Sequence, residues 1–191
     1  MKTRLSLTVL FILFLLNVGF TQEYAVDKGA TMIAGSVSFS SSGGELFEDY
    51  DGNSDNVFSL SPTINYFVGK NFFIGGGLEF STETQGDYKS NSIGVGPQIG
   101  YAFGNQESKV FPFVDLGLRY YGMSVDYGSG NSEGSGRDIF LGAGMIFPVR
   151  SHLGLTFEAG YHMLNIKEKD YDENYSGNVL GISIGIVGLL Y

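Results

Sequence analysis

The sequence contains no cysteine and few basic residues, and each shortage excludes a class of function. Without cysteine among its 191 residues, the chain has neither disulfides nor a thiolate metal site. Lys and Arg number 11 against 20 Asp and Glu, giving a formal charge of −9. Because nucleic-acid phosphates require basic side chains, the sequence predicts no nucleic-acid partner. We expect no cofactor and no metal.

Long apolar runs are also scarce, and the only one lies at the start of the chain. Residues 1–22 resemble a secretory signal peptide, with basic residues first, an apolar core at 5–16 and small residues before Gln22. The alternative is an uncleaved anchor helix, for which the run is short and lacks a following basic cluster. No cysteine follows the core, which excludes a lipoprotein anchor. With no second run of about 18 apolar residues, any membrane span of the mature chain must be a β-strand.

What the chain has instead is alternation of apolar and small polar residues, clearest at 58–81. This stretch predicts a β-hairpin, whose arms have the length that a tilted strand needs to cross an outer membrane. A soluble sandwich would place its apolar face inward. The opposite face here is serine, threonine and glycine, so we expect the apolar face to contact lipid. The predicted lipid-facing side chains are Phe58, Leu60, Ile64, Tyr66, Val68, Phe72, Ile74, Leu78 and Phe80.

Similar patterns recur along the chain and predict eight strands. They lie at 31–41, 58–68, 72–81, 92–103, 110–121, 137–147, 153–162 and 178–191. Connections at 69–71, 104–109 and 148–152 are brief, whereas those at 42–56, 82–91, 122–136 and 163–177 are longer. This pattern is typical of a transmembrane barrel with short periplasmic turns and long external loops. The predicted fold is all-β: an eight-stranded antiparallel up-and-down transmembrane β-barrel at 31–191, after a short polar periplasmic lead at 23–30.

Local departures from regular pairing are also expected. Pro62, Pro97 and Pro112 lie inside predicted strands and each removes a ladder donor, which predicts a bulge at each. The alternation slips near Val187, which predicts another bulge and an outward Leu189. Aromatic residues near strand ends are predicted to form interfacial girdles, although aromatic strand propensity alone is the alternative explanation. They are Tyr66, Phe67, Phe72, Phe73, Tyr101, Phe103, Phe111, Phe113, Tyr120, Phe147 and Tyr161.

These features together resemble the eight-stranded outer-membrane β-barrel domain family, which includes the membrane domains of outer-membrane proteins A, X and W. The matching segments are the signal peptide, MIAGSVSFSSS, SPTINYFVGKNFFIGGGLEF, GPQIGYAF and the closing GISIGIVGLLY. The resemblance covers roughly 30–191 and is specific for fold rather than for activity. It implies residence in the outer membrane of a Gram-negative-type envelope, with membrane lipids and lipopolysaccharide as partners. It also implies that the terminal Tyr191 is the assembly signal read by the barrel assembly machinery.

The inward face of the predicted strands carries the candidate site residues. They are Glu79, Gln98, Asp115, Arg119, Glu158 and His162, a predicted interior polar and ionic network. An eight-stranded barrel is only just wide enough for its side chains to fill, so we interpret the network as a packed polar core. Because an unpaired buried charge is costly, Arg119 is expected to contact Glu79, Asp115 or Glu158. A gated or narrow conductance is the alternative.

Two kinds of chemistry are weighed against this structural interpretation. Some small barrels are lipid-modifying enzymes that use a rim histidine with Ser or Asp, but no serine lies within two residues of His162. The acidic loop at 49–55 suggests calcium, but Gly52 does not fit the EF-hand spacing. We therefore predict a non-catalytic barrel with a structural or surface-interaction role, its acidic loops exposed to an external ligand. A narrow porin-like channel is the first alternative, and a soluble lipocalin-like lipid binder is the second.

Overall fold

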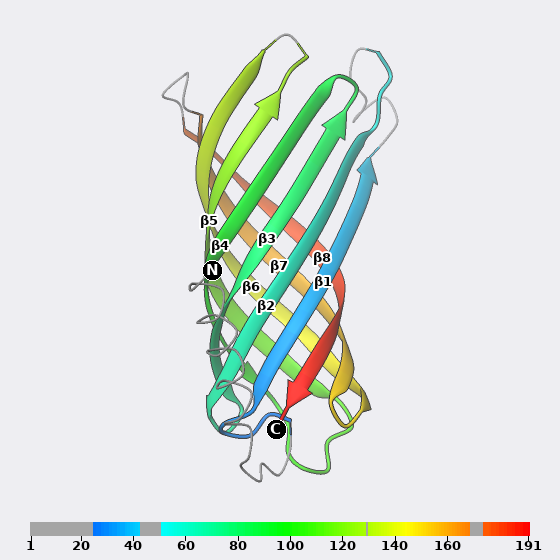
Figure 1. Ribbon diagram of the computed structural model, residues 1–191, viewed down its shortest axis with the longest axis vertical. Helices are drawn as coiled ribbons and strands as arrows, with labels where there is room; N and C mark the ends of the chain where they lie inside the picture. The colour runs from blue at the N-terminus through cyan, green and yellow to red at the C-terminus, as the bar shows by residue number, and fades with distance from the viewer. Residues whose placement is uncertain (1–24, 43–50, 129, 169–173) are drawn as a thin grey trace, which may run out of the picture.

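The chain folds into one closed β-barrel. A computed structural model describes residues 25–42, 51–128, 130–168 and 174–191, so the predicted signal peptide lies outside the described part. The strands follow in chain order around the barrel, and every neighbouring pair is antiparallel (Figure 1). They are β1 Thr31–Ser42, β2 Asp55–Gly69, β3 Phe72–Gln85, β4 Tyr88–Ala102, β5 Phe111–Asp126, β6 Asn131–Arg150, β7 Leu153–Glu168 and β8 Asn174–Leu190. This confirms the predicted fold class. No helix in the described ranges is long and apolar enough to cross a bilayer.

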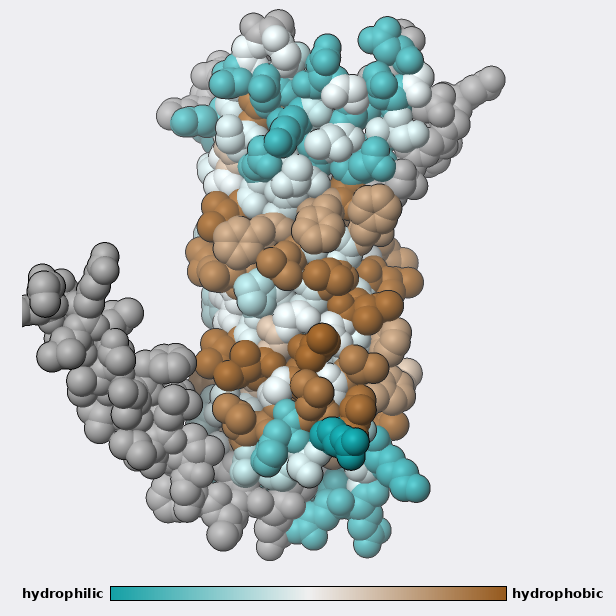
Figure 2. All heavy atoms as spheres, turned by 45° about the vertical axis from the view of Figure 1, so that its right-hand side comes forward, coloured by the Kyte–Doolittle hydropathy of each residue, from teal (hydrophilic) through white to brown (hydrophobic). Residues whose placement is uncertain are grey.

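The apolar face of the strands points outward, as the alternation predicts. In a soluble carrier the apolar side chains of the strands would converge on the centre of the barrel. Here four of them, Ile74, Leu78, Leu116 and Phe157, are between 40% and 46% exposed. Apolar side chains form a belt around the middle of the barrel, with hydrophilic residues beyond both ends (Figure 2). Such a belt is the outer surface of a membrane barrel. The soluble lipocalin-like alternative is therefore wrong.

The strands are longer than predicted at the end of the barrel opposite the termini. We call that end the loop end and the other the terminal end. At the loop end β3 and β4 pair up to Gln85↔Tyr88, and β5 and β6 pair up to Asp126↔Asn131. Most residues of three predicted loops are therefore in strands; these loops are 82–91, 122–136 and 163–177. The β3–β4 and β5–β6 hairpins project at the top of Figure 1. Beyond the apolar belt neither face of a strand contacts lipid, so the sequence no longer alternates between apolar and polar residues there. The backbone hydrogen bonds between strands do not depend on that alternation and continue.

The predicted alternation of long and short connections is consequently wrong. Only two residues join β3 to β4 at the loop end, whereas the connection from β4 to β5 at the terminal end is residues 103–110. Residues 43–50 of the loop predicted at 42–56 lie outside the described part.

The predicted bulges at Pro62, Pro97, Pro112 and Val187 are wrong as well. Pairing on either side of each keeps one register, and the shifts occur instead at Phe67/Gly69 and Pro148/Arg150, beside tight turns. Pro97 and Pro112 are exposed on the outer face of an otherwise regular ladder. A missing N–H can therefore be accommodated as a local gap in the ladder without inserting a residue.

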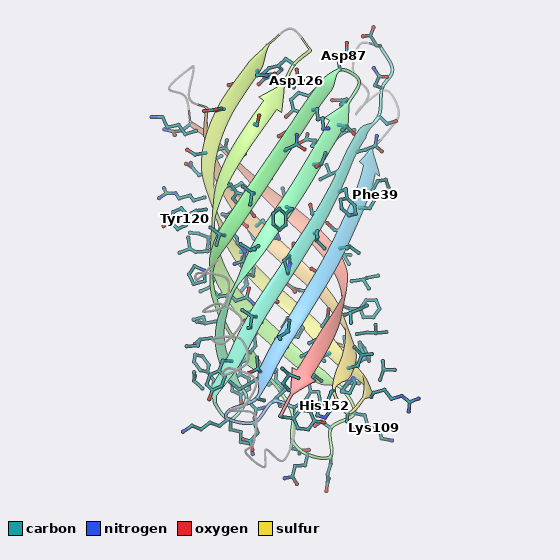
Figure 3. The ribbon with its side chains drawn as sticks, viewed as in Figure 1. Phe39, Asp87, Lys109, Tyr120, Asp126 and His152 are labelled. Atoms are coloured by element: carbon teal, nitrogen blue, oxygen red, sulfur yellow. The ribbon has the colours of Figure 1, made fainter. Side chains whose placement is uncertain are left out.

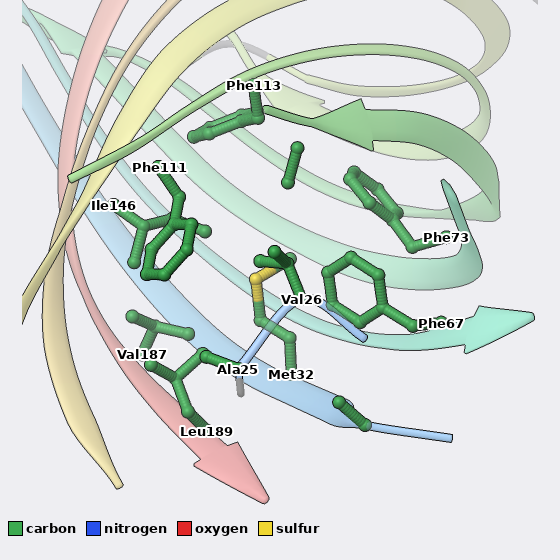
Figure 4. Close-up of a cluster of buried hydrophobic side chains, with 12 residues drawn as sticks. Ala25, Val26, Met32, Phe67, Phe73, Phe111, Phe113, Ile146, Val187 and Leu189 are labelled. Atoms are coloured by element: carbon green, nitrogen blue, oxygen red, sulfur yellow. The ribbon is translucent and has the colours of Figure 1, made fainter. Parts of the chain in front are cut away.

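The terminal end of the barrel is filled by apolar side chains. We call this cluster the apolar plug; ten of its residues are labelled in Figure 4. Its members are Ala25, Val26, Ala30, Met32, Phe67, Phe73, Ala102, Phe111, Phe113, Ile146, Val187 and Leu189. Four aromatics predicted for the girdles, at positions 67, 73, 111 and 113, are therefore interior. Leu189, expected to face out, is 1% exposed, because β8 keeps its alternation and the interior changes from polar to apolar at this end.

The segment before β1 completes the plug rather than forming a polar lead. Val26 is fully buried, and its carbonyl accepts a 2.8 Å hydrogen bond from the backbone of Asn71 in the β2–β3 turn. Gly29 donates to the carbonyl of Phe67, and Phe67 donates to that of Ala30. Asn71 adopts φ 68°, a left-handed conformation that asparagine tolerates well, and its side chain donates to the carbonyls of Ala102 and Gly104. Backbone and side-chain bonds thus hold this segment across the terminal end.

Candidate functional site

Above the apolar plug the barrel encloses a cavity of about 830 Å³. All six predicted network residues line it: Glu79, Gln98, Asp115, Arg119, Glu158 and His162. They come from β3, β4, β5 and β7, and each lies on the strand face opposite the lipid-facing residues. The structure thus brings the candidate residues together, and a functional role for them stays a prediction.

Arg119 is the centre of the lower part of this cavity. It is 5% exposed, and its guanidinium donates to Gln98 Oε1 at 2.8 Å and to the backbone carbonyls of Leu118 and Gly96 at 3.2 and 3.4 Å. Gln98 in turn donates to Asn65 Oδ1 at 2.8 Å. The guanidinium carbon also lies 4.7 Å from the centre of the Phe140 ring, within cation–π range.

The predicted carboxylate contact of Arg119 is wrong. Among the described residues, neither Glu79 nor Asp115 nor Glu158 forms an ion pair with it within 4.0 Å. A guanidinium has five N–H donors in a fixed fork, and here an amide oxygen and two carbonyls accept from it. Hydrogen-bond satisfaction, which is what burial requires, is therefore met without a carboxylate partner.

His162 pairs with an acid that the sequence reasoning missed. Its Nδ1 lies 2.6 Å from Asp138 Oδ2, and Asp138 is completely buried. The imidazole stacks on Phe140 with the ring centres 5.8 Å apart, so Phe140 lies between His162 and Arg119. The alternation of β6 could have identified Asp138, since it precedes the outward Ile139 by one position. It was missed because the residues that follow it are nearly all apolar or glycine.

Asp115 of β5 and Glu158 of β7 converge over Gly142 of β6, on the same part of the wall as Arg119 and His162. A Cβ placed on Gly142 would lie 2.0 Å from Asp115 Oδ1 and 2.7 Å from Glu158 Oε1. Within the described ranges, Asp115 Oδ1 and Asp138 Oδ1 have no hydrogen-bond partner. The interior therefore carries acceptor capacity that the protein itself does not use.

Glycines on the inner face make room for large side chains. A Cβ on Gly117 would lie 2.2 Å from Phe140, one on Gly144 2.5 Å from Phe113, and one on Gly94 2.5 Å from Tyr121. The glycine content of the chain is thus a packing requirement of a narrow barrel.

Toward the loop end the lining becomes hydroxylic and then acidic. Ser59 donates to the hydroxyl of Ser81 at 3.0 Å across β2 and β3. Further up, burial and then the charge of Asp55 raise the pKa of Glu83 above its ordinary value. Burial and then the charge of Glu83 raise the pKa of Tyr88. Asp55 and Glu83 belong to the loop end of the barrel. Glu83 lies beyond Phe80, the last apolar outward residue of β3.

Two features of the described residues bear on catalysis and on metal binding. The histidine–carboxylate pair at 162 and 138 orients an imidazole, but the contacts that the structure gives His162 are with Asp138 and Phe140. No group of three or more His, Asp or Glu side chains in the described ranges is arranged to hold a metal ion. Asp49 of the calcium suggestion lies outside these ranges.

Known structures of similar shape are outer-membrane barrels. Neisserial surface protein A is 20% identical, with a TM-score of 0.52, over 84% of this chain and 97% of that one. The N-terminal barrel domain of OprF from Pseudomonas aeruginosa is 12% identical, with a TM-score of 0.50, over 85% and 98%. At these identities the likeness shows the fold alone. No curated protein sequence matches.

A family model supplies the remaining comparison. The model described as "Outer membrane protein beta-barrel domain" matches residues 11–186, which is most of the chain. The match agrees with the closed eight-stranded barrel and its apolar belt. The chain therefore belongs to the outer membrane protein beta-barrel domain family and is an outer-membrane protein.

Proposed function

We propose that this protein is a non-catalytic and non-conducting barrel that acts structurally or through interactions at the cell surface. The observation that carries the proposal is the apolar plug. Phe67 and Phe73 meet edge to face with ring centres 5.6 Å apart, and both are almost fully buried. A through-channel needs a continuous polar path, and packed aromatics at one end interrupt it.

The proposal includes an orientation and a set of partners. Export by the signal peptide at 1–22 would place both chain ends on the periplasmic side and the acidic loop end outside, facing lipopolysaccharide. Tyr191 is proposed as the residue read by the assembly machinery. Its ring lies 5.1 Å from that of His152, whose Nδ1 lies 2.8 Å from the carbonyl of Leu189. These contacts hold the last residues against the β6–β7 turn.

Planar-bilayer recording tests the closed barrel. The native protein is expected to give no conductance steps, whereas the double variant Phe67→Ala, Phe73→Ala is expected to give small ones because it removes two of the four plug phenylalanines. A matched control is Tyr66→Ala, Phe72→Ala, which truncates the adjacent outward aromatics, 48% and 40% exposed. Regular conductance steps from the native protein would refute the proposal.

A narrow channel is the second candidate, and one observation favours it. Above the plug the barrel encloses a cavity of about 830 Å³, and serines and ionisable side chains contribute to its lining. Conduction would need the segment at 25–30 to leave the terminal end, breaking its bonds to Phe67 and Asn71. Native conductance that disappears when this segment is cross-linked to the β2–β3 turn would support this candidate.

A further inference from the structure

The barrel wall is incompletely paired at one seam. β1 and β8 pair from Thr31↔Leu190 only as far as Val37↔Ile184. Beyond that point β1 continues to pair with β2 as far as Ser42↔Asp55, and β8 continues to pair with β7 as far as Lys167↔Asn174. Both strands are therefore ordered above the last shared pair, but they are not bonded to each other there. We call this part of the wall the β1–β8 seam.

The side chains at the seam lack the cover that a paired wall gives. In a continued register Phe39 would face Ile182 on the outer surface. Instead Phe39 is 70% exposed, Leu180 75% and Ile182 74%, the highest values among the exposed large apolar side chains. Elsewhere such side chains reach at most 60%. The edges of β1 and β8 are thus apart at the seam.

The internal cavity reaches this seam. Its lining includes Phe39 and the consecutive residues 179–183 of β8. Successive strand residues point to opposite faces, so a run of five that all line the cavity marks a strand edge as its boundary. A Cβ on Gly181 would meet nothing within 4 Å, which agrees with open space beside β8.

The seam begins among outward apolar side chains, which include Phe39, Leu180 and Ile182. Phe39 lies at nearly the height of Tyr120 in Figure 3, and both are exposed aromatics on the outer face of the barrel. Because the apolar plug closes the terminal end, the cavity can exchange its contents only at the loop end or through this side opening. Lipid lies outside the seam, and a serine-lined interior lies within it.

We propose that a single-chain amphiphile, an alkyl chain with one small polar head, enters the cavity from the membrane through the β1–β8 seam. The alkyl chain lies against Phe39, Leu180 and Ile182, and the polar head reaches the hydroxyl-lined interior near Ser38 and Ser183. Unsatisfied backbone groups are costly in lipid, so a polar head beside the two unpaired strand edges offers them a hydrogen-bond partner. A wall paired along its full length would block this entry.

Fluorescence quenching in vesicles tests the proposal. The chain has no tryptophan, so a single introduced one is a clean reporter. Ser183→Trp places it on the cavity side of the seam, and Ser92→Trp places it in the same cavity on β4, four strands away around the eight-stranded ring. With bromododecanoic acid in phosphatidylcholine vesicles, we expect saturable loss of most Ser183→Trp emission and little loss for Ser92→Trp.

A staple across the seam gives the decisive control. The chain has no cysteine, so Phe39→Cys with Ile182→Cys can close the seam by oxidation, and Val37→Cys with Ile184→Cys staples a pair already formed. Because Phe39 and Ile182 line the proposed path, each pair is compared with its own reduced form. Oxidation of the first pair should abolish the quenching that its reduced form retains, while oxidation of the second pair should change nothing. If the first staple does not form, Gly181→Leu fills the cavity side of the seam, and Gly177→Leu is its matched control because neither Cβ meets a neighbour.

Several outcomes overturn the proposal. Equal quenching at both reporters, or quenching that persists with the seam closed, would mean entry at the loop end. Disulfide-linked dimers of Phe39→Cys alone would mean that a second copy covers the seam. Heat-modifiable gel migration confirms that each variant is folded. A negative result leaves the absence of conductance untouched, so this test and that of the closed barrel fail independently.

Discussion

At the scale of single residues, Arg119 is held by hydrogen bonds to uncharged acceptors rather than by a carboxylate partner. Arg119 meets an amide, two carbonyls and an aromatic face, although carboxylates line the same cavity. The pairing predicted from the sequence assumed that an opposite charge is what a buried charge requires. A donor fork with acceptors at suitable distances is sufficient.

Replacing Arg119 with methionine should be strongly destabilising. The change keeps most of the side-chain volume but leaves Gln98 Oε1 without its 2.8 Å donor. The loss of charge-assisted bonds is expected to cost about 3 kcal/mol of unfolding free energy. Urea unfolding in lipid vesicles measures it, with the exposed Arg150→Met as a control expected to lose less than about 0.5 kcal/mol. Equal losses for the two variants would contradict this account of the network.

Two glycines of β5 provide a matched test of interior packing. Gly117→Ala would place a Cβ 2.2 Å from Phe140, whereas Gly122→Ala would meet nothing within 4 Å. Overpacking should cost Gly117→Ala about 1–3 kcal/mol of unfolding free energy, while Gly122→Ala should be neutral or gain about 0.5 kcal/mol because glycine disfavours strands. Shortening Phe140 to leucine should partly rescue Gly117→Ala. The absence of rescue would mean that the cost has another origin.

At the scale of secondary-structure elements, strand length and lipid contact are separate properties. β3 and β4 continue past the apolar belt to a two-residue connection that includes Gly86, whose φ is +57°. Serine, threonine and asparagine in these extensions pair as regularly as the apolar residues do. Sequence alternation reports only the part of a strand that has one face in lipid, and so the predicted strands ended too early.

The β3–β4 extension should be most stable in acid. Burial, and then Asp55, raise the pKa of Glu83, so the folded extension favours the protonated carboxyl. Its stability is full below the ordinary pKa of glutamate and falls as the pH rises through the raised value.

Amide hydrogen exchange of this extension measures the effect. Exchange should become faster, beyond its intrinsic pH dependence, as the pH rises above the ordinary pKa of glutamate, and Glu83→Gln should remove that excess. Glu107→Gln, an exposed acid in the connection between β4 and β5, should leave it unchanged. An excess that persists in Glu83→Gln would assign the pH dependence to another group.

At the scale of the whole molecule, the interior is divided along the barrel axis. A polar network and an open cavity occupy the loop side, and the apolar plug occupies the terminal side. The segment at 25–30 contributes Val26 and Ala30 to that plug although it belongs to no strand. The proposals of a non-conducting barrel and of ligand entry at the seam both depend on this axial division and on the incompletely paired seam.

Lipid-phase labelling checks the inside-out arrangement directly. Leu60→Cys should react with a membrane-soluble maleimide and Ser61→Cys should not, because Leu60 is 41% exposed to lipid while Ser61 lines the cavity. A water-soluble maleimide entering from the loop end should show the reverse preference. The chain has no other cysteine to confuse the readout. Labelling of both sites by the lipid-soluble reagent would contradict the wall geometry around β2.

The sequence by itself determined the strand count, the direction of each face away from the terminal end, and the interior location of all six candidate residues. These follow from the alternation of apolar and polar residues, because successive side chains of a strand point to opposite faces whatever the neighbouring strands are. Only the tertiary structure decided that Arg119 bonds to Gln98, that Asp138 pairs with His162, that Val26 and Leu189 help to close the terminal end, and that β1 and β8 part above Val37. Those features depend on which residues of neighbouring strands lie side by side. The register between strands around the closed barrel sets this, and the sequence pattern of one strand does not contain it.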